Sequence, residues 1–268
     1  MRSERRKFLK QCFMGSCGLA LGMYTVEGLF LRKGSGRHGG FRNDAPSELW
    51  GWSREADWQE KLPGEAAIRC RLCPHECVLG ENDRGLCRTR VVKHGRLYTL
   101  AYGNPCALHI DPVEKKPLYH FLPTSSILSI ATAGCNLRCL NCQNWDISQS
   151  RPEDTRNFDL PPGKLAGLAR QEKTPSIAYT YSEPVIYYEY VYDTAVLARA
   201  QGIRNVLVTA GYIQPEPLRK LCRVVDAVTL DIKGFDRKTY RTLNGASLGP
   251  VLRTLKILRE EGIWLEVS

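Results

Sequence analysis

The sequence lacks an uninterrupted apolar run long enough to form a permanent membrane span. Even its most apolar early stretch, residues 13–30, is rich in glycine and contains Glu27. No internal repeat or low-complexity tract stands out, which disfavours repeat arrays. The chain also has no stripe of basic and aromatic residues of the kind that follows a phosphate backbone. A nucleic acid is therefore not an expected partner.

The formal net charge of +10 is concentrated at the start of the chain and does not change that expectation. Residues 1–44 contain nine Lys and Arg residues against three Asp and Glu residues, which leaves a net charge of only +4 for the other 224 residues. The chain has 268 residues, of which 43% are hydrophobic and 25% charged. It can therefore bury a full core, as one large domain or two small ones.

The first 30 residues resemble a targeting segment. Residues 4–10, Glu-Arg-Arg-Lys-Phe-Leu-Lys, are similar to a twin-arginine export signal, and the weakly apolar run follows them without a clear cleavage site. This resemblance predicts export or membrane association; a disordered basic tail on a cytoplasmic protein is the alternative. Residues 31–46, rich in Gly, Arg, Lys and His, are expected to be a linker.

Two domains are predicted after the linker. Residues 47–125 are expected to form a small cysteine-rich domain with a hairpin around His94-Gly95. From residue 126 to the end, short apolar strands alternate with helices. Strands are expected at 126–133, 176–181, 205–209, 227–231 and 264–267, and helices at 160–171, 184–200, 216–224 and 250–260.

This alternation predicts an α/β fold with a parallel sheet, and so many consecutive units indicate a barrel or part of one. The chain ends in or just after the fifth predicted strand. Because nothing then covers the edge of that strand, we expect a barrel that is truncated at its C-terminus.

The strongest chemical signal directly follows the first predicted strand. Cys135, Cys139 and Cys142 lie on one loop with C-x3-C-x2-C spacing. Three thiolates so placed can hold three irons of a 4Fe-4S cubane and leave the fourth iron open to S-adenosylmethionine. Active sites of parallel barrels lie at the C-terminal ends of their strands, so the position suits catalysis. A zinc site or three buried thiols is the alternative interpretation.

Residues 134–149, Gly-Cys-Asn-Leu-Arg-Cys-Leu-Asn-Cys-Gln-Asn-Trp-Asp-Ile-Ser-Gln, resemble the radical S-adenosylmethionine (radical SAM) protein of the AmmeMemoRadiSam system. That family is similar to the activating enzymes of pyruvate formate-lyase. Residues 70–87, 109–121, 177–184 and 226–235 support the resemblance. It implies a partial (βα)6 radical SAM barrel, TIM-barrel-like but short of one strand and helix here. It also implies reductive cleavage of S-adenosylmethionine to a 5′-deoxyadenosyl radical, with no substrate specified.

The resemblance further implies which residues bind S-adenosylmethionine. Tyr181, Ser182 and Glu183 end the second strand, where relatives hold the amino group of the ligand. Lys233 ends the fourth strand and would pair with the methionine carboxylate, with Asp231 beside it, near the substrate or a bound cation. The alternative for Glu183 and Lys233 is an ordinary solvated charge.

Other parts of the site are less well specified. Asn141 stands where the wider superfamily often has an aromatic residue against adenine, so that contact must come from elsewhere, either from Trp145 or from an aromatic residue of the barrel. The polar residues that lead into the barrel either line the substrate entrance or join the small domain to the barrel. The candidate catalytic residues are His109, Asp111 and His120 from this segment, together with Asp231.

A second group of cysteines has the spacing Cys70-x2-Cys73-x3-Cys77-x9-Cys87. Four thiols can complete the coordination of zinc or of an auxiliary iron–sulfur cluster. Two disulfides or four free thiols are the alternatives. His75 lies within this loop and is expected to be exposed, not a ligand.

The favoured prediction is thus a radical SAM enzyme of the AmmeMemoRadiSam type. The resemblance implies a low-potential electron donor and Memo-like and AMMECR-like proteins as partners. A glycyl-radical-enzyme activase, which needs a large glycyl-radical partner, is one alternative. Another is an iron–sulfur protein for electron transfer or structure, without radical chemistry. It would not need Glu183, Asp231 and Lys233 at strand ends.

Overall fold

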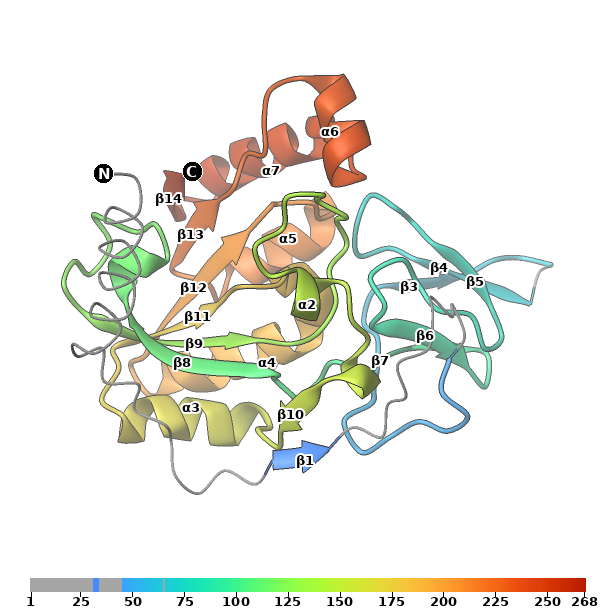
Figure 1. Ribbon diagram of the computed structural model, residues 1–268, viewed down its shortest axis with the longest axis horizontal. Helices are drawn as coiled ribbons and strands as arrows, with labels where there is room; N and C mark the ends of the chain where they lie inside the picture. Colours follow the sequence, from blue (N-terminus) through green and yellow to red (C-terminus); the bar gives the residue numbers. More distant parts are fainter. Residues whose placement is uncertain (1–30, 34–44, 65) are drawn as a thin grey trace, which may run out of the picture.

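The computed structural model describes residues 31–33, 45–64 and 66–268 (Figure 1). The expected export segment and most of the expected linker lie outside these residues. Leu31–Lys33 form strand β1, which pairs antiparallel with β10 (Arg156–Phe158), so part of the predicted linker is a strand. Within the described part of the chain, no helix is long and apolar enough to cross a membrane.

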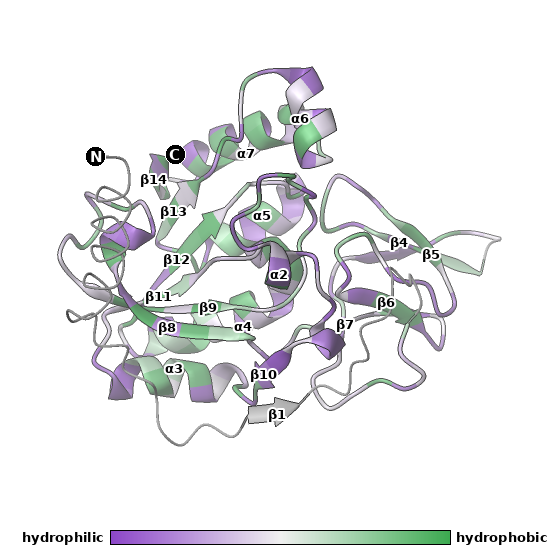
Figure 2. Ribbon diagram, in the orientation of Figure 1, coloured by the Kyte–Doolittle hydropathy of each residue, from purple (hydrophilic) through white to green (hydrophobic). Residues whose placement is uncertain are grey.

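A six-stranded mixed sheet forms the centre of the larger lobe in Figure 1, in the order β14-β13-β12-β11-β9-β8. The first five strands are parallel, and β8 runs antiparallel to β9. The strands are β8 Ala107–Pro112, β9 Ser126–Ala131, β11 Ser176–Tyr179, β12 Arg204–Thr209, β13 Ala227–Leu230 and β14 Trp264–Val267. The five predicted parallel strands are confirmed. Every residue of β11 and β13 is buried, and Figure 2 shows β8, β12 and β13 mainly in hydrophobic green.

Helices connect the successive parallel strands, as the alternation predicted. Several begin with a proline in the first turn, where its missing N–H costs no hydrogen bond. The connecting elements are α3 Pro162–Gln171, η3 Pro184–Tyr187 continuing into α4 Tyr188–Ala200, α5 Pro215–Cys222 and α7 Leu248–Glu260. The tyrosines of η3 and α4 are largely core residues, since Tyr187, Tyr188 and Tyr190 are fully buried.

Two helices and two single turns were not predicted. They are α2 Trp145–Ser148, α6 Arg237–Asn244, η1 Val113–Lys115 and η2 Pro152–Asp154. The local signals for α6 are clear in retrospect. The Asp236 carboxylate accepts a hydrogen bond from the Thr239 N–H at 2.7 Å, and Gly245 ends the helix in the left-handed conformation.

Two three-stranded antiparallel sheets form the second lobe, to the right in Figure 1. Their strands are β2 Arg54–Glu55, β7 Arg96–Thr99 and β6 Arg90–Lys93 in one sheet, and β3 Gln59–Lys61, β4 Ala67–Cys70 and β5 Val78–Gly80 in the other. The predicted hairpin is confirmed. His94 and Gly95 have φ values of 52° and 66°, as a two-residue turn between twisted strands requires.

The expected boundary between the two domains at residue 125 needs correction. β8, which falls within the small domain predicted from the sequence, pairs with β9 over six residues from Ala107↔Ala131 to Pro112↔Ser126. β8 is therefore the edge strand of the large sheet, next to β9. Alternation of strands and helices cannot reveal such an antiparallel edge strand, because no helix separates it from its neighbour.

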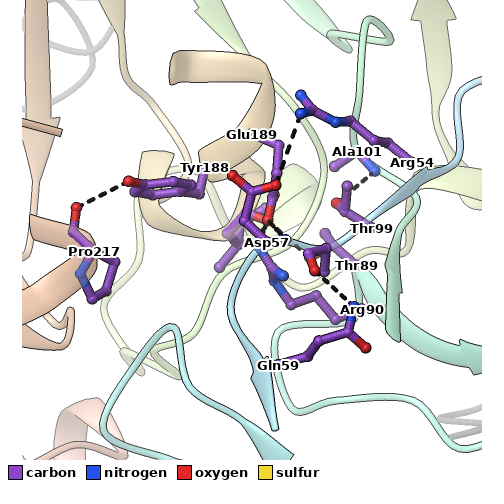
Figure 3. A network of polar contacts seen from close by, with 12 residues as sticks. Arg54, Asp57, Gln59, Thr89, Arg90, Thr99, Ala101, Tyr188, Glu189 and Pro217 are labelled. Carbon is purple, nitrogen blue, oxygen red and sulfur yellow. Dashed lines mark hydrogen bonds and ion pairs between the residues drawn. The ribbon is translucent and has the colours of Figure 1, made fainter. Parts of the chain in front are cut away.

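A buried ion pair joins the small lobe to the helical layer of the large one (Figure 3). Nη2 of Arg90, on β6, donates to both carboxylate oxygens of Glu189, on α4, at 2.8 Å each. The Asp57 backbone N–H also donates to Glu189, at 3.1 Å. Both charged side chains are essentially inaccessible, at 1% and 0% exposure. Because neither charge can reach water, each depends on the other.

Candidate active site

A cavity of about 520 Å³ lies at the carboxyl ends of β9, β11, β12 and β13. Ligands of parallel sheets bind at this edge. The cavity is lined by the cysteine loop after β9 and by the residues that follow the next three strands. The lining includes Lys115, Lys116, Cys135, Cys139, Cys142, Tyr181, Ser182, Glu183, Ala210, Asp231 and Lys233. The residues predicted to hold a cluster and those predicted to bind S-adenosylmethionine therefore share one cavity.

The cysteine loop begins at a residue that must be glycine. Gly134 has a φ of +101°, and a Cβ atom there would lie 2.5 Å from the Cys87 carbonyl oxygen and 2.7 Å from Cγ2 of Thr89. A larger residue would therefore be strained by its backbone conformation and would also clash. This close packing fixes the start of the loop against the small lobe.

Two of the three thiol sulfurs receive N–H donors. The Leu137 backbone N–H lies 3.3 Å from Sγ of Cys135, and Nδ2 of Asn244 lies 3.2 Å from Sγ of Cys139. Burial raises the pKa of both thiols; at Cys139 the Asn244 amide and the Lys233 charge oppose this rise. Such donors stabilise anionic sulfur, and a cationic metal core would make ionisation of the buried thiols favourable. The donor set therefore fits an iron–sulfur cluster.

Cys135, Cys139 and Cys142 line the same cavity, and three thiolates on one loop can hold three irons of a cubane. Among the residues described, no three Cys, His, Asp or Glu side chains are arranged to hold one metal ion.

Glu183 is held rigidly at the end of β11. Its carboxylate accepts hydrogen bonds from the Thr209 hydroxyl at 2.5 Å, the Ala210 N–H at 2.9 Å and the Val185 N–H at 3.1 Å. Burial raises its pKa, and these three hydrogen bonds oppose the rise. With an exposed fraction of only 4%, Glu183 is not the solvated surface charge of the alternative interpretation.

Lys233 and Asp231 form an ion pair at the end of β13. Lys233 Nζ lies 2.7 Å from Oδ2 of Asp231, and the Lys233 side chain is 32% exposed. Burial lowers the pKa of Lys233, but the Asp231 carboxylate, Cys139 and Glu183 together raise it overall. Cys139 and Glu183 line the same cavity as Lys233. Lys233 therefore stays positively charged beside the cysteine loop.

Tyr181 and Asp111 belong to a network at the border of the cavity. The Tyr181 hydroxyl donates to the Asp111 carboxylate, which Lys116 Nζ also contacts at 2.6 Å. The Lys116 ammonium lies 4.3 Å from the centre of the Tyr181 ring and is 1% exposed. Burial raises the pKa of Asp111, but hydrogen bonds from Lys115, Lys116 and Tyr181 outweigh it and lower the pKa overall. Asp111 is thus an ionised group that positions Lys116 and Tyr181, and it does not itself line the cavity.

Three aromatic candidates lie outside the lining of the cavity. The His109 and Tyr181 rings meet edge-on, with their centroids 5.7 Å apart. His120 is 79% exposed and faces Glu266 at 3.4 Å. Trp145, one of the suggested contacts for adenine, is 43% exposed and lines a separate pocket. The geometry does not support a catalytic role for either histidine or an adenine contact for Trp145.

The second group of cysteines also shares one cavity. Cys70, Cys73, Cys77 and Cys87 line it together, and the nine cysteines in the described part of the chain form no disulfide. Burial raises the pKa of Cys70 to about 11 and also raises that of Cys73 and Cys77. The alternative of two disulfides is therefore wrong for this structure.

His75 differs from its prediction. It is half-buried, lines the four-cysteine cavity, and its Nε2 lies 2.7 Å from the Asn136 carbonyl oxygen. Burial lowers its pKa, although the contact with Asn136 opposes the shift. The loop of the second cysteine group therefore packs directly against the loop of the first.

Three functional neighbours were not found from the sequence: Thr209, which fixes Glu183; Asn244, which donates to Cys139; and Arg90, which lines the four-cysteine cavity. Asn244 is 105 positions from its partner and carries no local signal. Thr209 did carry a usable sequence signal, because it ends the third parallel strand, beside the strand that leads to Glu183.

The sequence profile of the radical SAM superfamily matches residues 129–267, and the chain belongs to that superfamily. Its members are enzymes, and the domain implies a 4Fe-4S cluster and S-adenosylmethionine as cofactors.

Two relatives come from Methanocaldococcus jannaschii. The uncharacterized protein MJ0808 is 46% identical over 215 residues, which cover 80% of this chain and 63% of that protein. The uncharacterized protein MJ0674 is 26% identical over 170 residues, covering 61% of this chain and 45% of that one. The chain thus spans less than two thirds of the length of either relative.

Two solved structures are similar over part of the chain. One is TYW1 with a lysine-pyruvate adduct bound, with a TM-score of 0.40 and 16% identity, covering 57% of this chain and 62% of that one. The other is QueE from Escherichia coli, with a TM-score of 0.37 and 11% identity, covering 62% of this chain and 93% of that one.

Proposed function

We propose that this protein binds a 4Fe-4S cluster through Cys135, Cys139 and Cys142 and cleaves S-adenosylmethionine reductively beside it. When bound, the cluster supplies the electron that breaks a sulfur–carbon bond of S-adenosylmethionine and releases a 5′-deoxyadenosyl radical. The observation that carries the proposal is the single cavity that holds the three cysteines together with Glu183 and Lys233.

The residues around the cysteine loop bind and orient the methionine part of the ligand. Lys233, charged and near Cys139, pairs with the carboxylate. Glu183 and the backbone of Tyr181 and Ser182 hold the amino group. Because Thr209 and Ala210 fix the Glu183 carboxylate, binding costs little side-chain entropy. Asp231 holds Lys233 in place and is the catalytic candidate that does line the cavity.

The finer assignment is an enzyme of the AmmeMemoRadiSam type on a partial (βα)6 barrel with a small cysteine-rich N-terminal domain. Residues 70–87 and 109–121 support this type over a glycyl-radical-enzyme activase, because the resemblance extends to them. The four cysteines of the small lobe are proposed to hold zinc or an auxiliary iron–sulfur cluster. Memo-like and AMMECR-like partners, a low-potential electron donor and a twin-arginine-like export segment complete the proposal.

The test is an anaerobic assay of the reconstituted protein with dithionite as reductant. We expect S-adenosylmethionine to be converted to 5′-deoxyadenosine and methionine, measured by chromatography. Iron–sulfur content without 5′-deoxyadenosine would instead support an electron-transfer or structural protein.

A Lys233→Met variant is expected to bind S-adenosylmethionine more weakly while keeping its iron and sulfide. Loss of a charge-assisted hydrogen bond typically costs about 1.5–3 kcal/mol, or roughly ten- to a hundredfold in affinity. The measurement is a binding titration with cluster absorption followed in parallel. Lys164→Met is the matched control, because Lys164 pairs with Asp159 at the surface, away from the cavity. Equal affinity in wild type and Lys233→Met would contradict the assigned role.

A further inference from the structure

In the cavity of the second cysteine group, the guanidinium of Arg90 has buried N–H groups that no acceptor contacts. Arg90 lines this cavity with Cys70, Cys73, Cys77 and Cys87. Its Nη2 is bound to Glu189, but its Nε and Nη1 are buried and have no hydrogen-bond partner. An unpaired buried N–H costs the full desolvation penalty of the group. The side chain is 1% exposed, so water does not supply the missing acceptors.

The lining around Arg90 indicates which acceptors are missing. Arg90 shares the cavity with four cysteine side chains, and a thiolate sulfur accepts hydrogen bonds. The rest of the lining is mainly apolar, from Leu72, Leu79, Val185 and Ile186. An anionic group with sulfur acceptors would satisfy the free N–H groups.

Four thiols that line one cavity are a ligand set for zinc or for a cubane. Zinc has no redox chemistry, whereas a cubane can accept and pass on an electron. A centre that packs against the 135–142 loop, which belongs to the radical SAM match, is therefore of use as a cubane.

The two cysteine groups are separated by one layer of backbone. Gly134, which precedes Cys135, packs against the Cys87 carbonyl so closely that a Cβ atom would lie 2.5 Å from it. Asn136, which follows Cys135, lines the four-cysteine cavity and contacts Nε2 of His75 at 2.7 Å. Both neighbours of Cys135 therefore touch the second group. Centres held by the two cysteine groups would therefore be neighbours.

The four-cysteine cavity also lies near the surface on its other side. Leu86, next to Cys87, lines the cavity and is 39% exposed, and Val78, next to Cys77, is 51% exposed. An electron carrier docked on Val78 and Leu86 would contact the residues that directly adjoin Cys77 and Cys87 in the sequence.

We propose that Cys70, Cys73, Cys77 and Cys87 hold a second 4Fe-4S cluster, hydrogen-bonded by Arg90, that passes electrons to the cluster of the 135–142 loop. One electron would leave a low-potential one-electron carrier, pass to the four-cysteine cluster and move on to the cluster of the 135–142 loop. No bond is made or broken and no proton moves in this relay. The relay role rests on the proposed function, whereas binding of the second cluster does not.

Metal analysis tests binding of the second cluster. After anaerobic reconstitution, wild type should contain two cubanes, about eight irons per chain, and a Cys135/Cys139/Cys142 triple Ala variant about four. Adding Cys73→Ser to the triple variant should remove the remaining iron. One zinc per chain in place of iron, or a folded triple variant without metal, would overturn the proposal.

The relay is tested by comparing two reductants on the full chain. In a Cys73→Ser/Cys77→Ser variant, the ratio of cleavage driven by reduced flavodoxin to cleavage driven by dithionite should fall, because dithionite is small enough to enter the cavity of the 135–142 loop. Cys222→Ser, a half-buried thiol on α5, is the control and should keep the wild-type ratio. An unchanged ratio in the double variant would exclude the relay. Absence of cleavage by wild type with dithionite would instead refute the proposed function.

Arg90→Lys gives a second measurement that does not remove a ligand. Lysine keeps the charge opposite Glu189 but loses the Nε and Nη1 donors. Because hydrogen bonds to the sulfurs raise the potential of a cluster, the midpoint potential of the four-cysteine cluster should become more negative. Arg96→Lys, which alters an exposed pair with Glu55 in the same hairpin, should leave it unchanged. Equal midpoint potentials in wild type and Arg90→Lys would show that Arg90 does not hydrogen-bond to the cluster.

Discussion

A Cys139→Ala variant is expected to lose S-adenosylmethionine cleavage completely. Only three cysteines of the 135–142 loop line the active-site cavity, so removing one leaves the cluster with two protein ligands. The substitution also leaves Nδ2 of Asn244 without its sulfur acceptor. Both effects act against assembly of a cubane that already lacks a protein ligand at one iron.

The measurement combines 5′-deoxyadenosine formation with the paramagnetic resonance signal of the reduced protein. If the four-cysteine cavity holds its own cluster, part of the iron and part of the signal should persist in Cys139→Ala while cleavage is absent. Cys106→Ala, which removes a half-buried thiol that lines another pocket, should cleave like wild type. Cleavage by Cys139→Ala at the wild-type rate would contradict the assignment of the loop.

Sequence patterns predicted the features of the site that are local. The cysteine loop is a contiguous motif, and the five parallel strands are short apolar runs that can be recognised one at a time. Once parallel neighbours are assumed, their ends must meet at one edge, so the proximity of Cys135, Glu183 and Lys233 follows from the strand order. These predictions needed no information on how side chains pack.

The features that sequence reasoning missed depend on contacts across the fold. Asn244 reaches Cys139 only because α6 folds back over the cysteine loop, where Arg138 N and Leu140 N donate to backbone carbonyls of residues 243 and 244. Arg90 belongs to a hairpin that was predicted correctly, yet its partner is 99 positions away on α4. His109 and His120 had the right chemistry, but neither lines the cavity: His109 meets the edge of the Tyr181 ring, and His120 is exposed beside Glu266.

A Glu189→Gln variant is expected to be strongly destabilised. Glutamine keeps the shape of Glu189 but removes the charge that balances Arg90, and neither side chain can reach water. Breaking a buried pair by neutralising one partner costs about 3–5 kcal/mol of unfolding free energy. Anaerobic denaturant unfolding of the protein without metal measures this loss. Glu55→Gln, which disturbs the exposed pair with Arg96, should cost no more than about 1 kcal/mol.

The same variant links stability to the four-cysteine cavity. In Glu189→Gln, the positive charge of Arg90 loses its carboxylate partner. A negative charge in the cavity that Arg90 lines with Cys70 and Cys87 could replace that partner. An anionic cluster ligated by four thiolates would supply that balance, so the reconstituted variant should lose less stability than the metal-free one. The comparison requires both proteins in both states, because the metal also stabilises wild type by mass action. If the substitution costs as much with metal as without it, Arg90 does not sense the charge of the second centre. The guanidinium then serves only to join β6 to α4.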